Sequence, residues 1–313
     1  MTRGLGVPAR AALVGAAALL LIAAPLLLSP YATTTLTRIL VFALLAVSLD
    51  LLVGFVGLPS LGHGAYFGAG AYAAGWVAIH VTSSAPVALL AAVAAGGSVA
   101  AVAGCVAVRA RGVFFLMLTL AIGEIVQQLA ESWYDVTGGS DGLYGVPAAR
   151  LGGIALFDVG LYWYVLAVFA AGTAAVVCLA RSPLGHTWRG IRDNEPRMRA
   201  LGYRVYGYKL AAFVISGTVA GLAGGLLAAQ QRLVTPGDLG LGTSIPALLA
   251  VTIGGEGSLW GACLGAAVVV LIRDYLGSSL GGHGSLVLGL VFVVVVFALP
   301  GGVARAVASW RRA

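Results

Sequence analysis

The chain has 313 residues, of which 60% are hydrophobic and only 9% are charged, and its mean hydropathy is +1.00. Soluble domains carry roughly 25% charged residues, so this composition excludes a water-soluble enzyme or binding module. A membrane-spanning helix needs about 20 apolar residues. Residues 1–313 are therefore predicted to form one membrane domain, an all-α polytopic transmembrane bundle of about 8–10 spans.

Apolar runs follow one another along the chain. The first, residues 11–29, follows Arg3 and Arg10 and resembles a signal peptide. Its apolar stretch is about twice the usual length of a signal-peptide core, so we expect it to remain as a span. Further spans are expected near residues 39–58, 62–81, 86–108, 112–132, 160–180, 209–230, 244–256, 258–276 and 285–299.

Glycine interrupts two of these runs, 62–81 and 244–256. Both are expected to be re-entrant or broken helices, which a membrane tolerates only where the freed backbone lines protein or water. Elsewhere glycines recur at four-residue spacing, as at Gly217, Gly221 and Gly225. This spacing lets helix backbones approach closely in lipid, so tight packing is the expected role of these glycines.

Charge predicts the orientation of the spans. The connection at about 181–209 is strongly basic, whereas the few charged residues of the connection at about 133–160 are mainly acidic. Cytoplasmic loops are enriched in Lys and Arg, which places the first connection inside and the second outside. Ten spans reproduce this pattern with both termini cytoplasmic. The net charge of +7 is explained in this way, without a nucleic-acid partner.

The basic connection favours two short helices. Trp188 and Ile191 fall on one face of the first. Asn194 can cap the second helix, Pro196 can start it and Gly202 can end it. Two helices on such a loop make a docking surface for a partner; the other interpretation is a basic loop resting on anionic lipid headgroups.

Two acidic residues, Asp50 and Glu124, lie within apolar runs. Ionisable groups inside a membrane are costly and often functional. They could belong to an ion or proton relay, or they could form structural hydrogen bonds between helices. The sequence favours the structural role.

No enzymatic site is expected. The chain has no phosphate-binding loop and no HExxH helix, so it is predicted to hold no ATPase site of its own. Its three cysteines are widely separated and lie in apolar runs, which argues against a metal site or a disulfide. No cofactor is expected either.

Several motifs together resemble one family, the M-type permease of branched-chain amino acid ABC importers. The similarity covers about residues 40–302 in the family's order. The segments that carry it are Leu52–Gly57, Ser60–Gly68, Gly70–Tyr72, Arg111–Phe115, Thr119–Ala121, Thr137–Leu143, Gly145–Pro147, Ser182–Gly185, Ile191–Glu195, Leu201–Gly202, Lys209–Leu210, Gly254–Gly255, Gly257–Ser258 and Pro300–Gly302.

The resemblance implies half of a translocation pathway for leucine, isoleucine and valine in the bacterial inner membrane. Its partners would be an H-type permease, two cytoplasmic ATP-binding subunits and an extracytoplasmic substrate-binding protein. Candidate residues for coupling to the ATPases are Gly185, Trp188, Ile191, Arg192, Asn194, Glu195, Leu201 and Gly202. Candidate pathway residues are Gly62, His63, Gly64, Gly68, Gly254, Gly255 and Gly257.

Two alternatives stay open at this point. Closely related permeases carry urea, short amides or other amino acids. A less favoured function is an ion-coupled secondary transporter, in which Asp50 and Glu124 would be the coupling groups.

Overall fold

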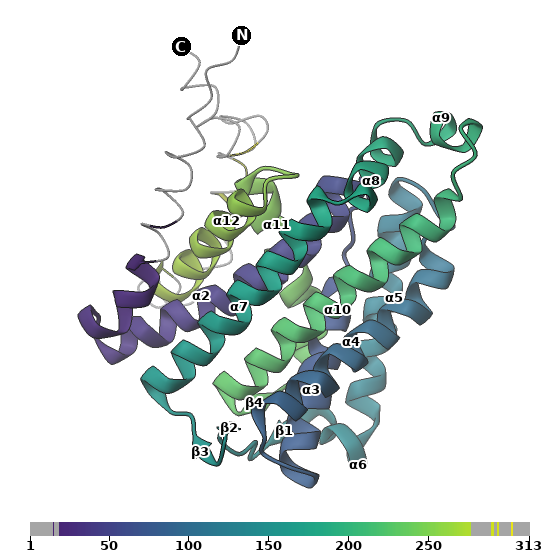
Figure 1. The fold of residues 1–313 in the computed structure, drawn as a ribbon. Helices are drawn as coiled ribbons and strands as arrows, with labels where there is room; N and C mark the ends of the chain where they lie inside the picture. Colours follow the sequence, from purple (N-terminus) through teal and green to yellow (C-terminus); the bar gives the residue numbers. More distant parts are fainter. Residues whose placement is uncertain (1–14, 16–18, 277–288, 291–292, 294–301, 303–313) are drawn as a thin grey trace.

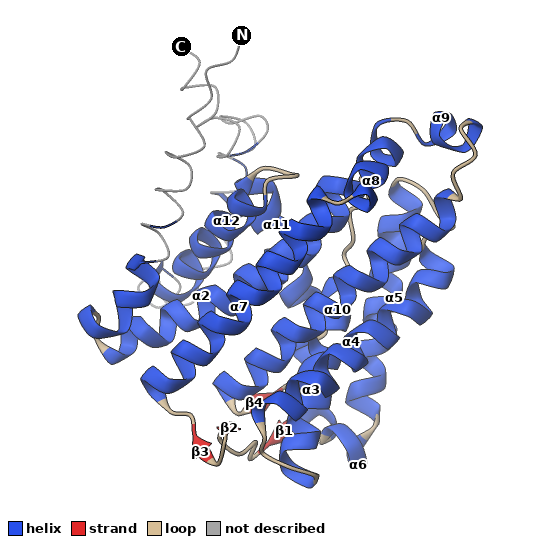
Figure 2. Cartoon of the chain, viewed as in Figure 1, coloured by secondary structure: helices blue, strands red, loops and turns tan. Residues whose placement is uncertain are grey.

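The structure is a computed structural model that describes residues 15, 19–276, 289–290, 293 and 302. The expected span at 11–29 is described only in part, and the span at 285–299 lies almost entirely outside the described residues. The described chain is nearly all helical, with long helices packed side by side (Figures 1 and 2). This arrangement confirms the expected polytopic helical bundle.

The long helices lie close to the predicted apolar runs. They are α2 (Pro30–Asp50) with its π-helical continuation η1 (Leu51–Val56), α3 (His63–His80), α4 (Ala85–Ala107), α5 (Val113–Ser132), α7 (Asp158–Arg181), α10 (Val205–Gln231), α11 (Leu241–Gly254) and α12 (Leu259–Leu271) with η4 (Ile272–Leu276). In the described part of the chain, six helical segments are long and apolar enough to cross a membrane: Pro30–Val56, Ala85–Ala107, Val113–Ser132, Asp158–Arg181, Val205–Gln231 and Pro236–Gly254.

Short elements gather at the two ends of the bundle (Figure 1). At one end lie α8 (Pro183–Asp193) and α9 (Glu195–Ala200). At the other lie α6 (Tyr134–Thr137), η2 (Gly139–Asp141), η3 (Pro236–Asp238) and the strands β1 (Leu143–Tyr144), β2 (Arg150–Leu151), β3 (Ile154–Ala155) and β4 (Leu233–Val234). β1 pairs antiparallel with β4, and β2 with β3. We call these the α8–α9 end and the β1–β4 end.

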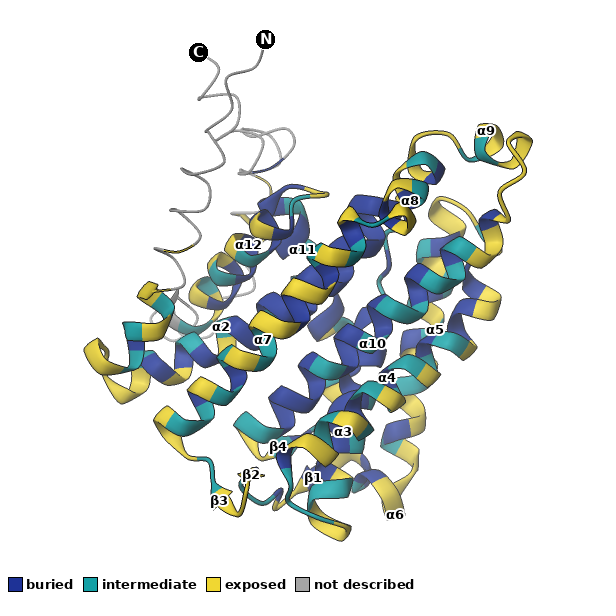
Figure 3. Cartoon of the chain, in the orientation of Figure 1, coloured by how far each residue is buried: buried dark blue, intermediate teal, exposed yellow. Residues whose placement is uncertain are grey.

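Helix α2 is the centre of the bundle. Nearly every side chain from Leu40 to Asp50 is buried, and the helix contacts α7, α10, α11 and α12 (Figure 3). Its last turns widen into η1, which ends at Gly57 with a φ of 76°. A residue with a side chain is strained in that left-handed conformation, so the glycine permits the sharp exit from the helix.

Glycine also sets the distances between α3, α4 and α10. A Cβ on Gly96 of α4 would lie 2.6 Å from the Cα of Gly221 in α10, and a Cβ on Gly70 of α3 would overlap the Gly221 carbonyl. The backbones of three helices therefore meet with no side chain between them. The predicted role of the four-residue glycine spacing is confirmed for Gly221.

Helices α3 and α11 are each continuous, so the breaks expected within the runs 62–81 and 244–256 are not found, because glycine weakens a helix without necessarily interrupting it. α3 begins only at His63, after the non-helical segment 57–62, and α11 begins at Leu241. Their first turns touch each other, because the Gly64 amide donates to Ser244 Oγ at 2.8 Å. From this contact α3 runs to the β1–β4 end and α11 to the α8–α9 end. We call residues 62–64 and 240–244 the central junction.

Candidate functional site

Helix α8 is held firmly on the bundle by its buried face. Trp188 is fully buried, and its indole N–H donates to the Tyr208 carbonyl at 2.9 Å. Ile191 is also buried, and a Cβ on Gly185 would overlap the Ala180 carbonyl. These three predicted coupling residues therefore anchor α8 to the chain itself, and a partner cannot reach them while α8 stays packed.

The predicted boundaries of α9 are confirmed in detail. Asn194 is its N-cap and accepts a hydrogen bond from the Arg197 amide at 3.0 Å. Gly202 follows the helix with a φ of 87°. Leu201, between the helix and this glycine, is 66% exposed. The second helix therefore presents an apolar side chain at the surface of the α8–α9 end.

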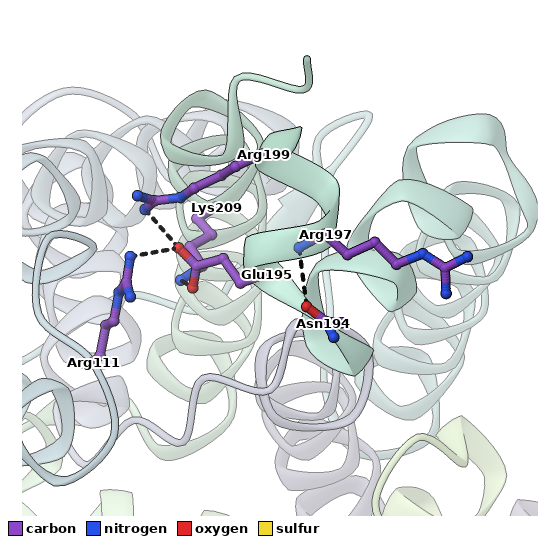
Figure 4. A network of polar contacts seen from close by, with 6 residues as sticks. All are labelled: Arg111, Asn194, Glu195, Arg197, Arg199 and Lys209. Carbon is purple, nitrogen blue, oxygen red and sulfur yellow. Dashed lines mark hydrogen bonds and ion pairs between the residues drawn. The ribbon is translucent and has the colours of Figure 1, made fainter. Parts of the chain in front are cut away.

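Glu195 ties α9 to the rest of the bundle (Figure 4). Its Oε2 accepts from Lys209 Nζ at 2.6 Å, and its Oε1 accepts from Arg199 at 2.7 Å and from Arg111 at 3.2 Å. Burial alone would raise the pKa of the Glu195 carboxyl, but Lys209 and the two arginines lower that pKa below its usual value. The carboxylate is therefore ionised at neutral pH and neutralises several cations.

Arg192 joins α8 to two other elements. Its guanidinium donates to the Gly54 carbonyl in η1, and it lies 3.8 Å from the Glu256 carboxylate in the connection between α11 and α12. A π-helical stretch leaves backbone groups differently placed from those of an α-helix, and here one of them accepts from an arginine. Arg192 is thus an internal link as well as a surface cation.

Asp50 completes this link from within the bundle. It is fully buried, and its Oδ1 accepts a hydrogen bond from the Gly257 amide at 2.8 Å. A Cβ on Gly54 would overlap both the Asp50 carboxylate and the Gly257 backbone. The contact supports the structural role that the sequence favours for Asp50. We call Asp50, Gly54, Arg192, Glu256 and Gly257 the α8 link.

The predicted pathway residues on α3 are packed, not exposed. His63 is fully buried, with Nε2 at 3.1 Å from both Ser48 Oγ and Ser216 Oγ. The three glycines on this side are buried as well. A Cβ added at Gly62 would overlap the Thr119 carbonyl, and one added at Gly68 would overlap the Leu239 side chain. A Cβ added at Gly64 would lie 2.7 Å from the Gly240 carbonyl oxygen. These residues therefore hold the central junction together.

The predicted pathway glycines near the α8–α9 end are packed in the same way. A Cβ on Gly254 would overlap the Gly261 carbonyl, and the Gly257 amide is the donor to Asp50. Gly255 adopts a φ of 101° and ends α11. In this structure the three glycines shape the turn between α11 and α12.

Open space borders the central junction on another side. A cavity of about 760 Å³ is lined by Gly242, Thr243 and Pro246 at the start of α11. Its wall also carries apolar side chains and the ion pair between Arg38 and Asp274, which measures 2.8 Å. Ligand pockets in proteins have about 300–1,000 Å³. The start of α11 therefore faces a cavity large enough for a small solute.

Sequence reasoning missed Arg111 and Lys209 as partners of Glu195. A general signal was present, because one acidic residue among many basic ones in a loop needs partners. The choice of partner depends on the fold, since Arg111 is 84 residues away in the chain.

The chain matches the model of a family described as "Branched-chain amino acid transport system / permease component" over residues 31–299. It is 30% identical to the high-affinity branched-chain amino acid transport system permease protein LivM of Escherichia coli K12, over 90% of this chain and 72% of that protein. LivM of Salmonella typhimurium is also 30% identical, over 91% and 73%. The autoinducer 2 import system permease protein LsrC of Klebsiella pneumoniae is 34% identical over a shorter stretch, which covers 37% of this chain and 34% of that protein. No solved structure matches significantly.

Proposed function

The chain belongs to the branched-chain amino acid transport system permease component family, and from this premise we propose that it is a membrane permease subunit of an ABC importer for leucine, isoleucine and valine. The family match over residues 31–299 carries the proposal. The meeting of the first turns of α3 and α11 inside the bundle supports it, because transporters place helix N-termini at substrate sites near the middle of the membrane. Family membership also favours this function over an ion-coupled secondary transporter.

The complete importer would contain this chain, an H-type permease, two cytoplasmic ATP-binding subunits and an extracytoplasmic binding protein. Each permease would supply half of the passage. This chain would leave ATP hydrolysis to its partners, because its sequence lacks a phosphate-binding loop. Substrate passage would be driven by a change of shape that the ATP-binding subunits impose on the permeases.

The α8–α9 end would receive that change of shape. The exposed side of α8 and α9, with Leu201 and Arg197, would contact an ATP-binding subunit. The buried side would pass the motion on through Trp188 and the α8 link. Coupling thus needs two classes of residue, one that binds the partner and one that fixes α8 to the bundle.

Transport by the assembled complex tests the function. The chain, its partner permease, the ATP-binding subunits and the binding protein are reconstituted in liposomes. We expect ATP-dependent uptake of radiolabelled leucine, isoleucine and valine, and no uptake when ATP is omitted. Uptake of urea or a short amide without any of the three amino acids would redirect the substrate assignment.

Cysteine labelling tests the orientation. In a background without the three native cysteines, Ser140→Cys should react with an impermeant thiol reagent added to intact cells, because Ser140 is exposed at the β1–β4 end. Ala200→Cys, exposed on α9, should react only after the cells are opened. Reaction of both from the same side would refute the proposed topology.

A further inference from the structure

Helix α5 carries a stripe of polar residues inside a membrane span. Glu124, Gln127, Gln128 and Glu131 follow one another at spacings of three, one and three residues along Val113–Ser132. Residues three and four apart lie on the same face of an α-helix. The four side chains therefore form one polar stripe, which we call the α5 stripe, in the half of the helix nearest the β1–β4 end.

Two members of the stripe, Glu124 and Gln128, do not take part in packing the chain. Glu124 and Gln128 are exposed, and within the described residues Glu124 forms no hydrogen bond or ion pair. Gln127 Nε2 donates to Glu131 Oε1 at 3.0 Å, a contact inside the stripe itself. The buried face of α5, which holds it on the bundle, is made by other residues: Phe115, Thr119, Gly123 and Ala130.

A second, apolar stripe runs beside the first. Phe114, Ile125 and Leu129 are all exposed, Phe114 at 78% and Ile125 at 67%. Their spacing of eleven and four residues places them on one face of the helix. This face lies beside the α5 stripe and points in a different direction. In the part of α5 nearest the β1–β4 end, the outward surface is therefore divided into a polar half and an apolar half.

The two halves need different surroundings. A carboxylate deep in hydrocarbon is strongly disfavoured, so acidic residues within spans face the bundle interior or a water-filled cavity. Glu124 is exposed on the surface of this chain and does not lie in the interior of the bundle. The apolar half is suited to lipid or to a tightly packed neighbour, whereas the polar half requires water at the depth of the membrane.

The α5 stripe also reaches the central junction. The Gln127 side-chain oxygen lies directly against Gly240. A Cβ added at Gly240 would overlap this oxygen. About two turns further toward the α8–α9 end, α5 touches the segment that leads into α3, because Thr119 Oγ1 accepts a hydrogen bond from the Leu61 amide at 3.2 Å. The stripe thus leads from the β1–β4 end to the place where α3 and α11 begin.

We propose that the α5 stripe lines the water-filled substrate passage between this chain and its partner permease, with the Glu124 carboxylate facing the ammonium group of the passing amino acid. The proposal rests on the proposed function and adds the wall of the passage to it. A carboxylate attracts the ammonium group that all three substrates share, while their different side chains need no individual contact. Selection among side chains is then left to other parts of the importer.

Accessibility within the complete importer tests the passage. In the cysteine-free background, Glu124→Cys and Gln128→Cys should react with a charged, membrane-impermeant methanethiosulfonate, and leucine with its binding protein should slow the reaction. Ile125→Cys and Leu129→Cys are matched controls on the same helix and should stay unreactive. Four unreactive cysteines, or four that react equally, would overturn the proposal.

Transport by Glu124→Gln tests the contact with the ammonium group. We expect the apparent KM for leucine to rise about tenfold, which corresponds to about 1.4 kcal/mol, while Ile125→Leu, on the apolar half of the same helix, should leave KM near normal. An unchanged KM in Glu124→Gln would overturn this contact. Failure of the wild-type complex to transport any branched-chain amino acid would instead refute the proposed function, so the two failures are distinguishable.

Discussion

Replacing Gly221 with isoleucine is expected to leave almost no folded protein in the membrane. A Cβ at this position would lie 2.5 Å from the Ala92 carbonyl oxygen and 2.8 Å from the Gly96 Cα. Both neighbours are backbone atoms of α4, so no side-chain rotation can relieve the overlap. The two helices would have to separate, which would also pull α10 away from α3.

The loss of folded protein is expected to be large because the free energy of unfolding of a protein is small. Adding methylene groups to a packed interior costs about 1–3 kcal/mol and sometimes more, and total stabilities are about 5–15 kcal/mol. Isoleucine adds a whole branched side chain where three backbones meet. We expect the yield of monodisperse protein, measured by fluorescence-detected size exclusion, to fall close to zero.

Gly207 supplies the control for this experiment. It lies on the same helix, and a Cβ there would meet nothing within 4 Å. Gly207→Ile should therefore give a near-normal yield and elution profile. A normal profile for Gly221→Ile would show that α4 and α10 can move apart freely, against the close packing seen in the structure.

Local signals predicted the shape of the α8–α9 end well. Asn194 as a cap and Gly202 as a stop act through their own backbone neighbourhood, and such short-range effects can be read from sequence. The end of α11 was predicted for the same reason, because Gly254 and Gly255 mark it directly, whereas the glycines within α3 do not interrupt that helix.

The partners of the charged residues could not be predicted in this way. Asp50 is 207 residues from Gly257, and Arg192 lies far along the chain from Gly54. In a soluble helix, polar and apolar faces distinguish the outside from the core. In a membrane both lipid and protein interior accept apolar side chains. The sequence therefore could not show that Asp50 is buried and Glu124 exposed.

The predicted pathway glycines illustrate a different limit. Glycine allows close backbone packing and also allows a ligand to approach a backbone, and its presence does not say which. The structure shows packing at Gly62, Gly64 and Gly254. Their role in transport stays a proposal, in which the junctions that they hold change shape during the cycle.

Replacing Arg192 with glutamate is expected to abolish transport while the importer still assembles. The guanidinium would be lost from the Gly54 carbonyl, and a hydrogen bond to a charged group contributes about 1.5–3 kcal/mol. The new carboxylate would also face Glu256, which lies 3.8 Å from the arginine in the wild type. Both side chains are partly exposed, so this repulsion adds about 0.2–1 kcal/mol, and together with the lost hydrogen bond it removes the connection of α8 to η1 and to the α11–α12 turn.

The anchor of α8 should survive this change. Trp188 and Ile191 remain buried, and the exposed side of α8 and α9 is unaltered, so the ATP-binding subunits should still attach. We expect purified complexes to contain all subunits and to hydrolyse ATP at the basal rate. Stimulation of hydrolysis by the leucine-loaded binding protein, and leucine uptake, should both be lost. Arg192→Lys, which keeps a cation near Gly54 and Glu256, should retain part of both.

Arg197→Glu separates this internal link from docking on the partner. Arg197 lies on the exposed side of α9, and its side chain points away from the Glu195 network (Figure 4). If the outer side binds an ATP-binding subunit, this variant should weaken subunit attachment, which co-purification measures directly. Arg192→Glu should keep attachment and lose stimulation, so the two variants fail differently. Loss of attachment in Arg192→Glu would instead make Arg192 a docking residue, because an internal link alone cannot release a partner that binds elsewhere.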